Sequence, residues 1–507
     1  MPTAKPEGEI IVIGGGSAGC VIAARLAAAG HLVTLIEAGP DYGAQSSGDW
    51  PQDLLDARSL PTSHDWGYEG EGSGGQLLAF DRCQAIGGCS SHNGTTQNVG
   101  WAGDYDAWAA AGSPGWDAQS LRPLFTRALA AYQARRYEPH EIQPFHQALL
   151  AAAVAQGIEC VDDFDQLDGL AGAGCSPVSN TVDGVRINAA FAYLDDLRSC
   201  NSNLTIVANS LVERIVFDGK QVTGVEFSRE GVRQRINSKR IIISSGAYGS
   251  PELLLRSGVG SAQELSRLGI ASVHDIPGVG RNLHDQPTAQ LEFAGTAQLA
   301  AELAEFGRDA VVMDEQTIIK LRSPFSEDAP YDLHIYPWVE RDASQPHGWR
   351  CIVPVGLLRP RSRGQLMLKS SDPQVRPHID TGYLQDEDDL QRLLYGLDWA
   401  QQLVSSGPLA AYVGSPLITP ADSVTQEQKT AWIRANHTHY WHPAGTCKMG
   451  PASDPDAVVE HTGKVHGLDG LYVADASVFP DVPRGTTALA SAVVGERIAL
   501  FLMDEFK

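Results

Sequence analysis

A histidine near the end of the chain and a glycine-rich turn near its beginning carry the clearest chemistry in this sequence. His442 lies in Tyr440-Trp441-His442-Pro443-Ala444-Gly445-Thr446-Cys447, and the turn reads Gly14-Gly15-Gly16-Ser17-Ala18-Gly19. An imidazole that titrates near neutral pH can take the proton of an alcohol while a hydride leaves the same carbon. A single histidine is more often structural than catalytic, so His442 needs support from the elements around it.

The turn has the spacing of a dinucleotide-binding site, in which each glycine has its own task. Gly14 makes the tight turn, Gly16 lets the backbone approach a pyrophosphate, and Gly19 lets the helix pack closely on the strand. The pyrophosphate then lies at the positive end of the helix. Glu37 closes the next strand, where a carboxylate can bind the hydroxyl groups of a ribose. The turn alone does not distinguish FAD from NAD.

The elements next to the turn predict a βαβ unit with parallel strands and a right-handed crossover. Glu9–Ile13 is a continuous apolar run, as a buried parallel strand requires. Ala18–Ala29 predicts an alanine-rich helix that ends at Gly30, and Leu32–Glu37 predicts the second strand.

Apolar strands of the same kind recur in the middle and at the end of the chain. Arg240–Ser244 predicts a buried strand, followed by a turn of small residues and a helix with Pro251 in its first turn. Leu471–Asp475 predicts a last strand, and Ala488–Glu505 predicts a last helix.

The segments between these strands differ from them in composition. Residues 40–100 are rich in Gly, Ser and Asp and predict long loops, which in enzymes often carry function. The helices expected elsewhere are Leu121–Tyr132, Pro144–Gln156 and one near 387–405, and the expected strands are Leu204–Val207, Leu211–Phe217, Val222–Phe227 and two near 331–339 and 351–358. We therefore predict a discontinuous nucleotide-binding domain with a second domain inserted in two pieces.

A second glycine-rich segment reads Ile86-Gly87-Gly88-Cys89-Ser90-Ser91-His92-Asn93-Gly94. Two adjacent glycines favour close approach of the backbone to a planar ligand, with hydrogen bonds from Ser90, Ser91 and Asn93. An ordinary polar loop explains the same residues, and the residue types alone leave both interpretations open.

The composition argues against several classes of partner. The 507 residues carry a formal net charge of −23, which repels the phosphates of nucleic acids and anionic lipid surfaces. Residues 1–9 contain no apolar signal segment, and no run of about eighteen apolar residues occurs, so we expect a cytoplasmic protein without a membrane partner. The eight cysteines include no Cys-x-x-Cys pair, so we expect reduced thiols and no metal site.

Together these segments resemble the glucose–methanol–choline (GMC) oxidoreductases over almost the whole chain. The resemblance rests on ordered motifs: Gly14–Gly19 with Glu37, Gly87–Asn93, Asp104-Tyr105-Asp106-x-Trp108, Ser244–Gly260, Pro277–Asn282, Pro360–Gly364, His442–Gly450 and Val473–Ser477. It implies an α/β fold with two parts. These are a Rossmann-type FAD-binding domain over residues 8–100, 201–290 and 440–507, and an inserted α+β substrate-binding cap domain over 101–200 and 291–439.

The resemblance also implies a cofactor, a base and a reaction. FAD is the implied cofactor, and His442 is the implied base, beside the pocket residues Tyr440 and Trp441. A small-molecule alcohol would lose its proton to His442 and its hydride to flavin N5, and oxygen or another acceptor would then reoxidise the flavin, with oxygen giving hydrogen peroxide. The implied cofactor contacts are Gly14, Gly16, Ser17, Ala18, Gly19, Glu37, Ala38, Gly87, Ser91, His92, Asn93, Gly94, Val212, Ala247, Asp475, Ala476 and Thr487.

Two positions set this chain apart within the family pattern. The place after the last strand where the family usually has a second His or Asn falls on Thr486. Its hydroxyl can hydrogen-bond a substrate oxygen but cannot share a proton as histidine does, so we predict His442 as the sole strong base and Thr486 as its companion. His92 lies where choline-oxidase-like members attach the flavin covalently, and covalent and noncovalent binding both stay open.

The missing partner favours a primary alcohol on an aromatic or heteroaromatic ring, such as pyridoxine, because members resembling pyridoxine oxidases also lack it. Choline, hydroxymethylfurfural and a sugar hydroxyl are the alternatives, and Trp338 with Glu340 offers the aromatic and acidic groups that choline needs. A flavin-containing hydroxynitrile lyase is the alternative of a different class. The candidate pocket walls are Trp66, Trp101, Tyr336, Trp338 and Trp441.

Overall fold

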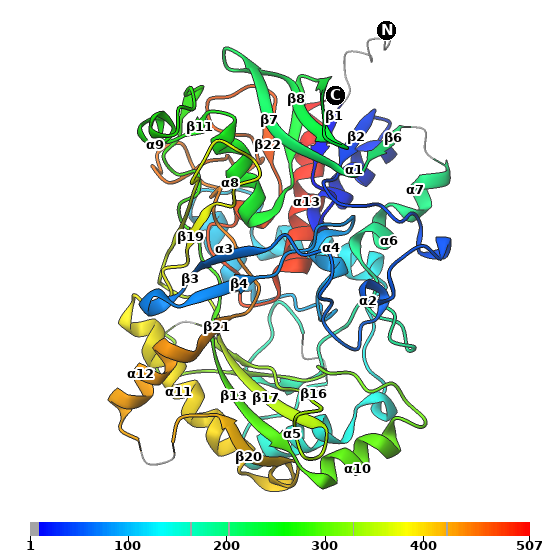
Figure 1. The fold of residues 1–507 in the computed structure, drawn as a ribbon, viewed down its shortest axis with the longest axis vertical. Helices are drawn as coiled ribbons and strands as arrows, with labels where there is room; N and C mark the ends of the chain where they lie inside the picture. The colour runs from blue at the N-terminus through cyan, green and yellow to red at the C-terminus, as the bar shows by residue number, and fades with distance from the viewer. Residues whose placement is uncertain (1–9, 163–164, 201–202, 328, 422–423, 507) are drawn as a thin grey trace.

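A five-stranded parallel sheet carries the glycine turn and joins segments from the start, middle and end of the chain (Figure 1). The computed structural model describes residues 10–162, 165–200, 203–327, 329–421 and 424–506, so Glu9 and the predicted domain ends at 8, 201 and 507 lie outside the described residues. The strand order is β22 (Leu471–Val473), β10 (Arg240–Ile243), β1 (Ile10–Ile13), β2 (Val33–Ile36) and β6 (Leu204–Val207). All neighbours are parallel, which confirms the predicted βαβ unit.

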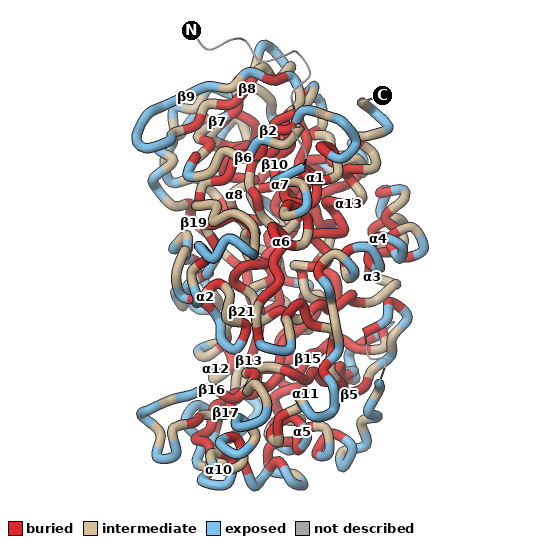
Figure 2. Tube along the Cα trace, turned by 90° about the vertical axis from the view of Figure 1, so that its right-hand side faces the viewer, coloured by how far each residue is buried: buried red, intermediate tan, exposed pale blue. Residues whose placement is uncertain are grey.

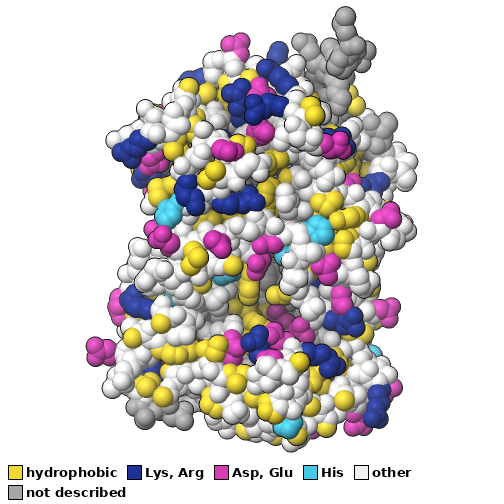
Figure 3. Space-filling model, in the orientation of Figure 1, with side chains coloured by type: hydrophobic (Ala, Val, Ile, Leu, Met, Phe, Trp, Pro, Cys, Tyr) yellow, Lys and Arg dark blue, Asp and Glu magenta, His cyan; other side chains and the backbone are white. Residues whose placement is uncertain are grey.

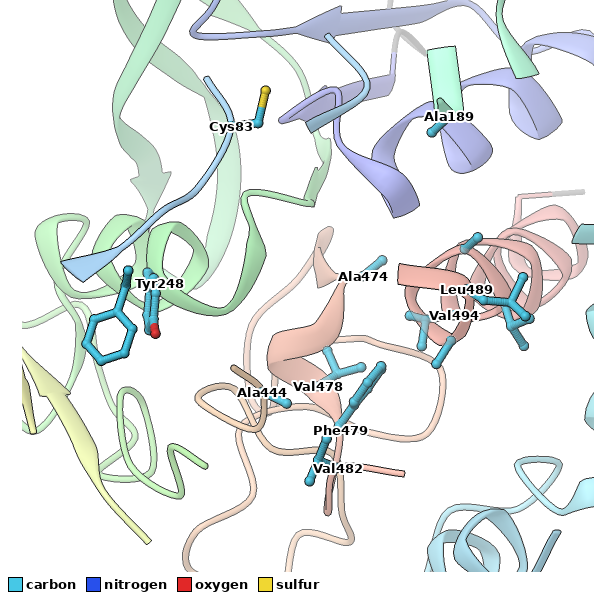
Figure 4. Packing of buried hydrophobic residues seen from close by; sticks show 14 of the residues in the cluster. Cys83, Ala189, Tyr248, Ala444, Ala474, Val478, Phe479, Val482, Leu489 and Val494 are labelled. Atoms are coloured by element: carbon cyan, nitrogen blue, oxygen red, sulfur yellow. The ribbon is translucent and has the colours of Figure 1, made fainter. Parts of the chain in front are cut away.

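Two long helices pack together beside this sheet. They are α1 (Ser17–Ala28) and α13 (Thr487–Glu505), the predicted first and last helices. A Cβ on Gly495 would lie only 2.8 Å from the carbonyl oxygen of Ala18, so the helices approach closely. Figure 4 shows apolar side chains of this region of the core, including Leu489 and Val494 from α13. Figure 2 shows that buried chain continues from here into the part around β13 and β15.

Helix α8 (Gly246–Arg256) contains Pro251 in its interior, so the prediction that this proline lies in the first turn was wrong. Proline has no N–H, which leaves the carbonyl of Ala247 without its helical hydrogen bond. Thr446 Oγ1 donates a hydrogen bond of 2.6 Å to that carbonyl instead. The donor comes from a distant segment, so local sequence does not reveal that the helix tolerates its proline.

Residues 40–100 are not the long loops that their composition predicts. They contain the hairpin of β3 (Tyr68–Glu71) and β4 (Leu77–Phe80), the short helix α2 (Gln52–Leu55) and three 3₁₀ turns, η1 (Gln45–Ser47), η2 (Ser73–Gly75) and η3 (Gly88–Ser91). β3 also pairs with β19 (His378–Asp380). This partner comes from the other half of the chain, which explains why the hairpin has only a weak local pattern.

The second sheet is antiparallel and lies in the lower half of Figure 1. Its path is β20 (Val413–Ile418), β13 (Pro287–Gly295), β17 (Trp349–Leu357), β15 (Leu333–Ile335), β14 (Ile318–Leu321) and β5 (Gly172–Gly174), with β16 (Trp338–Arg341) on β17 and β21 (His437–His439) on β13. The single strand predicted near 331–339 is two strands, because Pro337 between them cannot donate to a sheet. The predicted helix near 387–405 is α11 (Glu387–Val404), which packs on β13, β15 and β17.

The remaining elements surround these two sheets. The predicted strands near 211–217 and 222–227 are confirmed as a hairpin that a third strand extends. The helices are α3 (Ala102–Ala110), α4 (Ala118–Ala131), α5 (Pro144–Ala155), α6 (Ala189–Tyr193), α7 (Asp195–Cys200), α9 (Ala262–Arg267), α10 (Ala297–Phe306) and α12 (Gln426–Asn436). The strands are β7 (Ser210–Asp218), β8 (Gln221–Arg229), β9 (Val232–Asn237), β11 (Val259–Gly260), β12 (His274–Asp275) and β18 (Gln365–Met367).

The two sheets draw on different parts of the chain, as an inserted domain requires. The domain bounds themselves stay a prediction, and β13 begins at Pro287, before the predicted boundary at residue 290. Within the described ranges, no helix is both long enough and apolar enough to cross a membrane.

The hydrogen bond that replaces the missing helical one in α8 leads to a stability prediction. Thr446 is fully buried, so Thr446→Val should leave the carbonyl of Ala247 unpaired and lower the free energy of unfolding by about 1–3 kcal/mol. Urea unfolding followed by circular dichroism measures the change. Thr446→Ser keeps the hydroxyl, so it should lower the free energy of unfolding by less. Equal losses in the two variants would mean that the methyl group, and not the hydrogen bond, carries the effect.

Candidate active site

One cavity of about 1340 Å³ reaches both the glycine turn and His442. Figure 3 shows a hollow in the face of the molecule with acidic side chains at its edge. The predicted residues that line the cavity are Gly14, Gly16, Ser17, Ala18, Glu37, Ala38, His92, Asn93, Gly94, Val212, Ala247, Tyr440, Trp441, His442, Asp475, Ala476, Thr486 and Thr487. The structure thus brings together residues from both ends of the sequence. Three predicted residues, Gly19, Gly87 and Ser91, are not among the lining residues.

The glycine turn presents an open surface to the cavity. Gly14 has φ of +94°, and Gly19 lies so close to Gly14 that a Cβ would sit 1.9 Å from the carbonyl oxygen of Gly14. A Cβ on Gly16 would instead meet nothing nearer than 3.8 Å, so protein packing does not require this glycine. Helix α1 also lacks a side-chain cap at its N-terminus. Open space before uncapped N–H groups fits the pyrophosphate of the implied FAD.

Glu37 lies at the end of β2 and supports the same turn. Its carboxylate accepts hydrogen bonds of 2.7 Å from the N–H groups of Gly15 and Gly39. Burial raises the pKa of Glu37, and these backbone donors oppose that effect. The side chain lines the cavity, so lone pairs remain for the ribose hydroxyls that the sequence assigns to it.

The second glycine-rich segment packs against the first glycine turn. Gly87 N–H donates to the carbonyl of Gly15 at 2.7 Å, and a Cβ on Gly88 would lie 2.6 Å from Cα of Gly16. The polar side chains of this segment also form hydrogen bonds with protein groups. Ser90 Oγ donates to the carbonyl of Gly87, Ser91 Oγ donates to that of Ile86, and Asn93 Oδ1 accepts from the N–H of Thr95.

His92 and Asp475 line the cavity, and both form hydrogen bonds with protein groups. His92 Nε2 lies 2.9 Å from the carbonyl oxygen of Ser63, and burial lowers the pKa of this histidine. Attachment of a flavin through Nε2 would have to break that hydrogen bond. Asp475 accepts from Gly246 N–H at 2.9 Å and from Ser250 Oγ at 2.5 Å, which fixes the start of α8 against the end of β22.

His442 has one ring nitrogen bound to protein and one without a protein partner. Its Nδ1 lies 2.6 Å from Gln286 Oε1, and Gln286 Nε2 donates to the carbonyl of Pro483 at 3.0 Å. A carbonyl can only accept, so the amide nitrogen of Gln286 must face Pro483 and its oxygen must face His442. Nδ1 therefore carries the proton. Nε2, which has no hydrogen bond within the described part of the chain, keeps its lone pair in the cavity.

The surroundings of His442 keep the imidazole uncharged. Burial, together with the nearby cationic Arg82 and the neighbouring His439, lowers the pKa of His442 to about 3. Arg82 Nη1 donates to the carbonyl of Trp441 at 3.1 Å, so it holds the residue before the base. Asp285 accepts from the backbone N–H of His442 at 2.9 Å, and burial raises the pKa of Asp285 to about 6. His442 is thus a free base throughout the neutral pH range.

Thr486 lies in the cavity wall but is bound to backbone. It precedes α13, and its Oγ1 accepts from Asn98 N–H at 3.1 Å and lies 3.4 Å from the carbonyl oxygens of Thr96 and Asn98. The hydroxyl therefore joins the start of α13 to the segment after His92. These contacts leave a lone pair of the oxygen for a substrate, in line with the predicted role of a hydrogen-bonding companion to His442.

Aromatic rings form the wall near His442. Tyr336 and Tyr440 are stacked with centroids 3.9 Å apart and an angle of 7° between the rings, and Tyr440 lies 4.5 Å from the ring of His442. Of the predicted walls, Trp66, Tyr336, Trp338 and Trp441 line the cavity, whereas Trp101 is not among the lining residues. A flat ring fits against such a wall.

Several residues of the site were not predicted from the sequence. They are Arg82, Asp285, Gln286 and the acidic pair Asp314 and Glu315, which lies in the cavity wall before β14. A signal exists for some of them. Asp285 and Gln286 lie shortly after the Pro277–Asn282 motif, and Asp314 and Glu315 follow the apolar run Val311–Met313, where two carboxylates are out of pattern.

Comparisons with known proteins show the family of the chain. The GMC oxidoreductase family matches residues 8–288 with its N-terminal model and residues 360–495 with its C-terminal model. An oxygen-dependent choline dehydrogenase of Photobacterium profundum is 31% identical over 97% of this chain and 92% of its own length. The mitochondrial choline dehydrogenase of Homo sapiens is 31% identical over 98% of this chain and 89% of its own.

Solved structures resemble the chain over its whole length. Pyridoxine 4-oxidase from Mesorbium loti superposes with a TM-score of 0.85 at 25% identity and covers 98% of this chain and 99% of its own. A formate oxidase superposes with a TM-score of 0.84 at 21% identity and covers 99% of both chains, which is a likeness of fold.

The Gln286 contact predicts how pH controls the base. Gln286→Glu places a negative charge against Nδ1, which raises the pKa of His442 and keeps the ring protonated to higher pH. Flavin reduction by substrate, followed in an anaerobic stopped-flow instrument, should then fall at the acid side of the range from about pH 5 to 9. Asp285 titrates in both enzymes, so the difference between the two profiles belongs to His442.

Gln286→Met is the matched variant for this experiment. It has a similar volume and no acceptor for Nδ1, so it should slow flavin reduction at every pH without moving the profile. If the Glu variant gave the same pH profile as the unchanged enzyme, Gln286 would not control the protonation of His442.

Proposed function

The chain belongs to the GMC oxidoreductase family, and from this premise we propose that it oxidises a small primary alcohol to an aldehyde with His442 as the base. The observation that carries the proposal is the Nε2 lone pair of His442, open to a cavity that also contains the dinucleotide turn. Bound FAD supplies the acceptor for the hydride.

Residues around the cavity can accept the proton that the alcohol loses and later release it. Nε2 of His442 accepts the proton of the alcohol, because Nδ1 already carries one for Gln286. The oxygen becomes a carbonyl as the hydride leaves, so its proton grows acidic and a weak base suffices. Arg82 disfavours the imidazolium that forms, which promotes later loss of the proton. The Thr486 hydroxyl in the cavity wall is the proposed hydrogen-bond partner of the substrate oxygen.

A primary alcohol on a heteroaromatic ring, such as pyridoxine, is the proposed substrate. The stacked Tyr336 and Tyr440 next to His442 support it, since they offer a flat wall at the reacting end of the cavity. The pyridoxine 4-oxidase of Mesorbium loti supports it further, as a solved structure of the same fold. Oxygen as the electron acceptor is supported by bacterial relatives that are oxygen-dependent dehydrogenases.

Choline is the second candidate, because the curated relatives at 31% identity are choline dehydrogenases. The site suggested by Trp338 and Glu340 does not help this candidate. Glu340 accepts from Trp338 Nε1 at 3.1 Å and forms an ion pair with Arg350, so its charge is already compensated. A quaternary ammonium group therefore gains little from Glu340.

An anaerobic screen tests the reaction and its base together. Pyridoxine, benzyl alcohol, furfuryl alcohol, a sugar and choline are mixed with the holoenzyme, and flavin absorbance is followed. We expect pyridoxine to bleach the flavin, and on exposure to air we expect hydrogen peroxide. A hydroxynitrile lyase would leave the flavin oxidised with every alcohol. His442→Asn should slow bleaching about 10²–10⁴-fold with unchanged flavin content, since a general base contributes this much.

His439→Asn is the matched control for the base. His439 lies near His442, but its Nε2 bonds the carbonyl of Ala79 at 2.9 Å and it does not line the cavity. Its replacement should change the rate far less. Comparable rates of flavin reduction in the His442→Asn enzyme and the unchanged enzyme would reject His442 as the base.

A further inference from the structure

The backbone of Trp441, the residue just before His442, has an unfavourable conformation. Its φ is +58°, in the left-handed region that glycine adopts freely and that a residue with a bulky side chain rarely occupies. Such a conformation persists only where the surrounding structure enforces it, and it is most common at functional sites. The contacts of Trp441 therefore show what keeps the base loop, residues 440–446, in its shape.

Side chains from two other segments hold the peptide group that joins Trp441 to His442. Arg82 Nη1 donates to the carbonyl of Trp441 at 3.1 Å, and Asp285 Oδ1 accepts from the N–H of His442 at 2.9 Å. A positive group thus lies at the oxygen of this peptide and a negative group at its N–H. Charged partners make the stronger kind of hydrogen bond, so the two side chains fix the plane of the peptide.

Arg82 is anchored outside the base loop. Its backbone N–H donates to Asp65 Oδ1 at 2.8 Å, and its carbonyl accepts from the N–H of Trp66 at 2.9 Å. Its Nε donates to the carbonyl of Asp81. Both hydrogen bonds that the guanidinium forms in the described part of the chain therefore go to backbone carbonyls, which fits a role in holding main chain.

The N–H of Trp441 also has a side-chain partner, because it donates to His439 Nδ1 at 3.2 Å. The proton of His439 is on Nε2, which bonds the carbonyl of Ala79 at 2.9 Å. His439→Asn keeps an acceptor here, since an asparagine amide oxygen can replace Nδ1, so this contact survives in that control variant. Arg82→Met, in contrast, leaves the carbonyl of Trp441 without a donor.

We propose that Arg82 is a positioning residue for the base: it keeps Trp441 in the left-handed conformation and thereby aims Nε2 of His442 at the alcohol. This inference rests on the proposed function, in which His442 takes the proton of the alcohol. Without the Arg82 contact, Trp441 would relax toward an ordinary φ, and the rotation would move the backbone of His442. A displacement of about 1 Å at a reacting group can cost about 10²-fold in rate.

Flavin reduction measures the effect on the base. With the alcohol that bleaches the flavin in the screen, Arg82→Met should lower the limiting rate of anaerobic flavin reduction about 10–10²-fold. The dissociation constant of the alcohol should stay within about threefold. The rates are compared at about pH 9, where burial keeps His442 uncharged, so altered protonation does not explain the loss. Arg82→Lys keeps a donor for the carbonyl and should lower the rate less.

Trp441→Gly separates backbone strain from charge. Glycine adopts a left-handed φ at little cost, so the loop should keep its shape without Arg82. We therefore expect Arg82→Met to cost less than about threefold in the Trp441→Gly background. Arg82→Lys should show the same rescue, and it takes the place of Arg82→Met if that variant does not bind flavin. A direct effect of the guanidinium charge would cost the same factor in both backgrounds, and that result would overturn the proposal.

Arg376→Met is the matched control. Arg376 is another cation of the cavity wall, and its guanidinium lies 5.1 Å from the ring centroid of Trp66 and 5.2 Å from that of Tyr68. Within the described ranges it forms no hydrogen bond or ion pair with the base loop. Its removal should change neither the rate nor the dissociation constant. A loss as large as that of Arg82→Met would show that a cation in the cavity, and not the carbonyl contact, is what matters.

Hydrogen exchange of the His442 backbone amide tests the positioning without any reaction. The amide is observed by NMR in holoenzyme labelled with ¹⁵N-histidine and is assigned from the spectrum of His442→Asn. Arg82→Met should make it exchange at least about tenfold faster, because the N–H leaves Asp285 when the loop relaxes. Adding Trp441→Gly should restore the protection.

The exchange rates also separate this inference from the proposed function. Unchanged exchange in Arg82→Met would refute the positioning by Arg82, whatever the rates of flavin reduction. Faster exchange in Arg82→Met, together with normal flavin reduction in His442→Asn, would leave the hold on the loop intact and refute only the proposed function.

Discussion

The side chain of Gln286 joins three segments that lie far apart in the sequence: the residue before β13, the loop that carries His442, and the loop before α13. Its oxygen accepts from His442 and its nitrogen donates to Pro483, so turning the amide over would break both hydrogen bonds. All three groups are buried, and a buried group without its partner would cost about 1–3 kcal/mol. The protonation and orientation of the proposed base both follow from this one amide.

The rest of the fold brings the partners of that amide to one place. Parallel strands end at the same edge of a sheet, so β1, β10 and β22 deliver the glycine turn, the start of α8 and Asp475 together. Strand β13 of the second sheet begins directly after Gln286, which places the base between the two sheets. Asp104 accepts from the backbone of Arg484 at 2.8 Å and also pairs with its guanidinium group, which fixes the loop that contains Pro483 and Thr486.

Local patterns predicted the parts of the protein whose interactions are local. Local residue patterns predicted the glycine turn, β1, β2 and the long helices, because these elements are formed by residues close together in the sequence. Gln286 has no such signal, because its partner His442 lies 156 residues further along the chain. The same holds for Pro251, which α8 tolerates through Thr446. Glu315 precedes β14, and only the assembled cavity reveals that its carboxylate has no cation among the residues that the structure describes.

The central claim is that His442 is a neutral histidine with its proton on Nδ1 and a free lone pair on Nε2. The ¹⁵N NMR spectrum of the holoenzyme with labelled histidines measures this directly, with His442 assigned from the spectrum of a variant that lacks it. The structure predicts one protonated and one unprotonated ring nitrogen at neutral pH, with the proton on Nδ1. An imidazolium at neutral pH, or a proton on Nε2, would contradict the account.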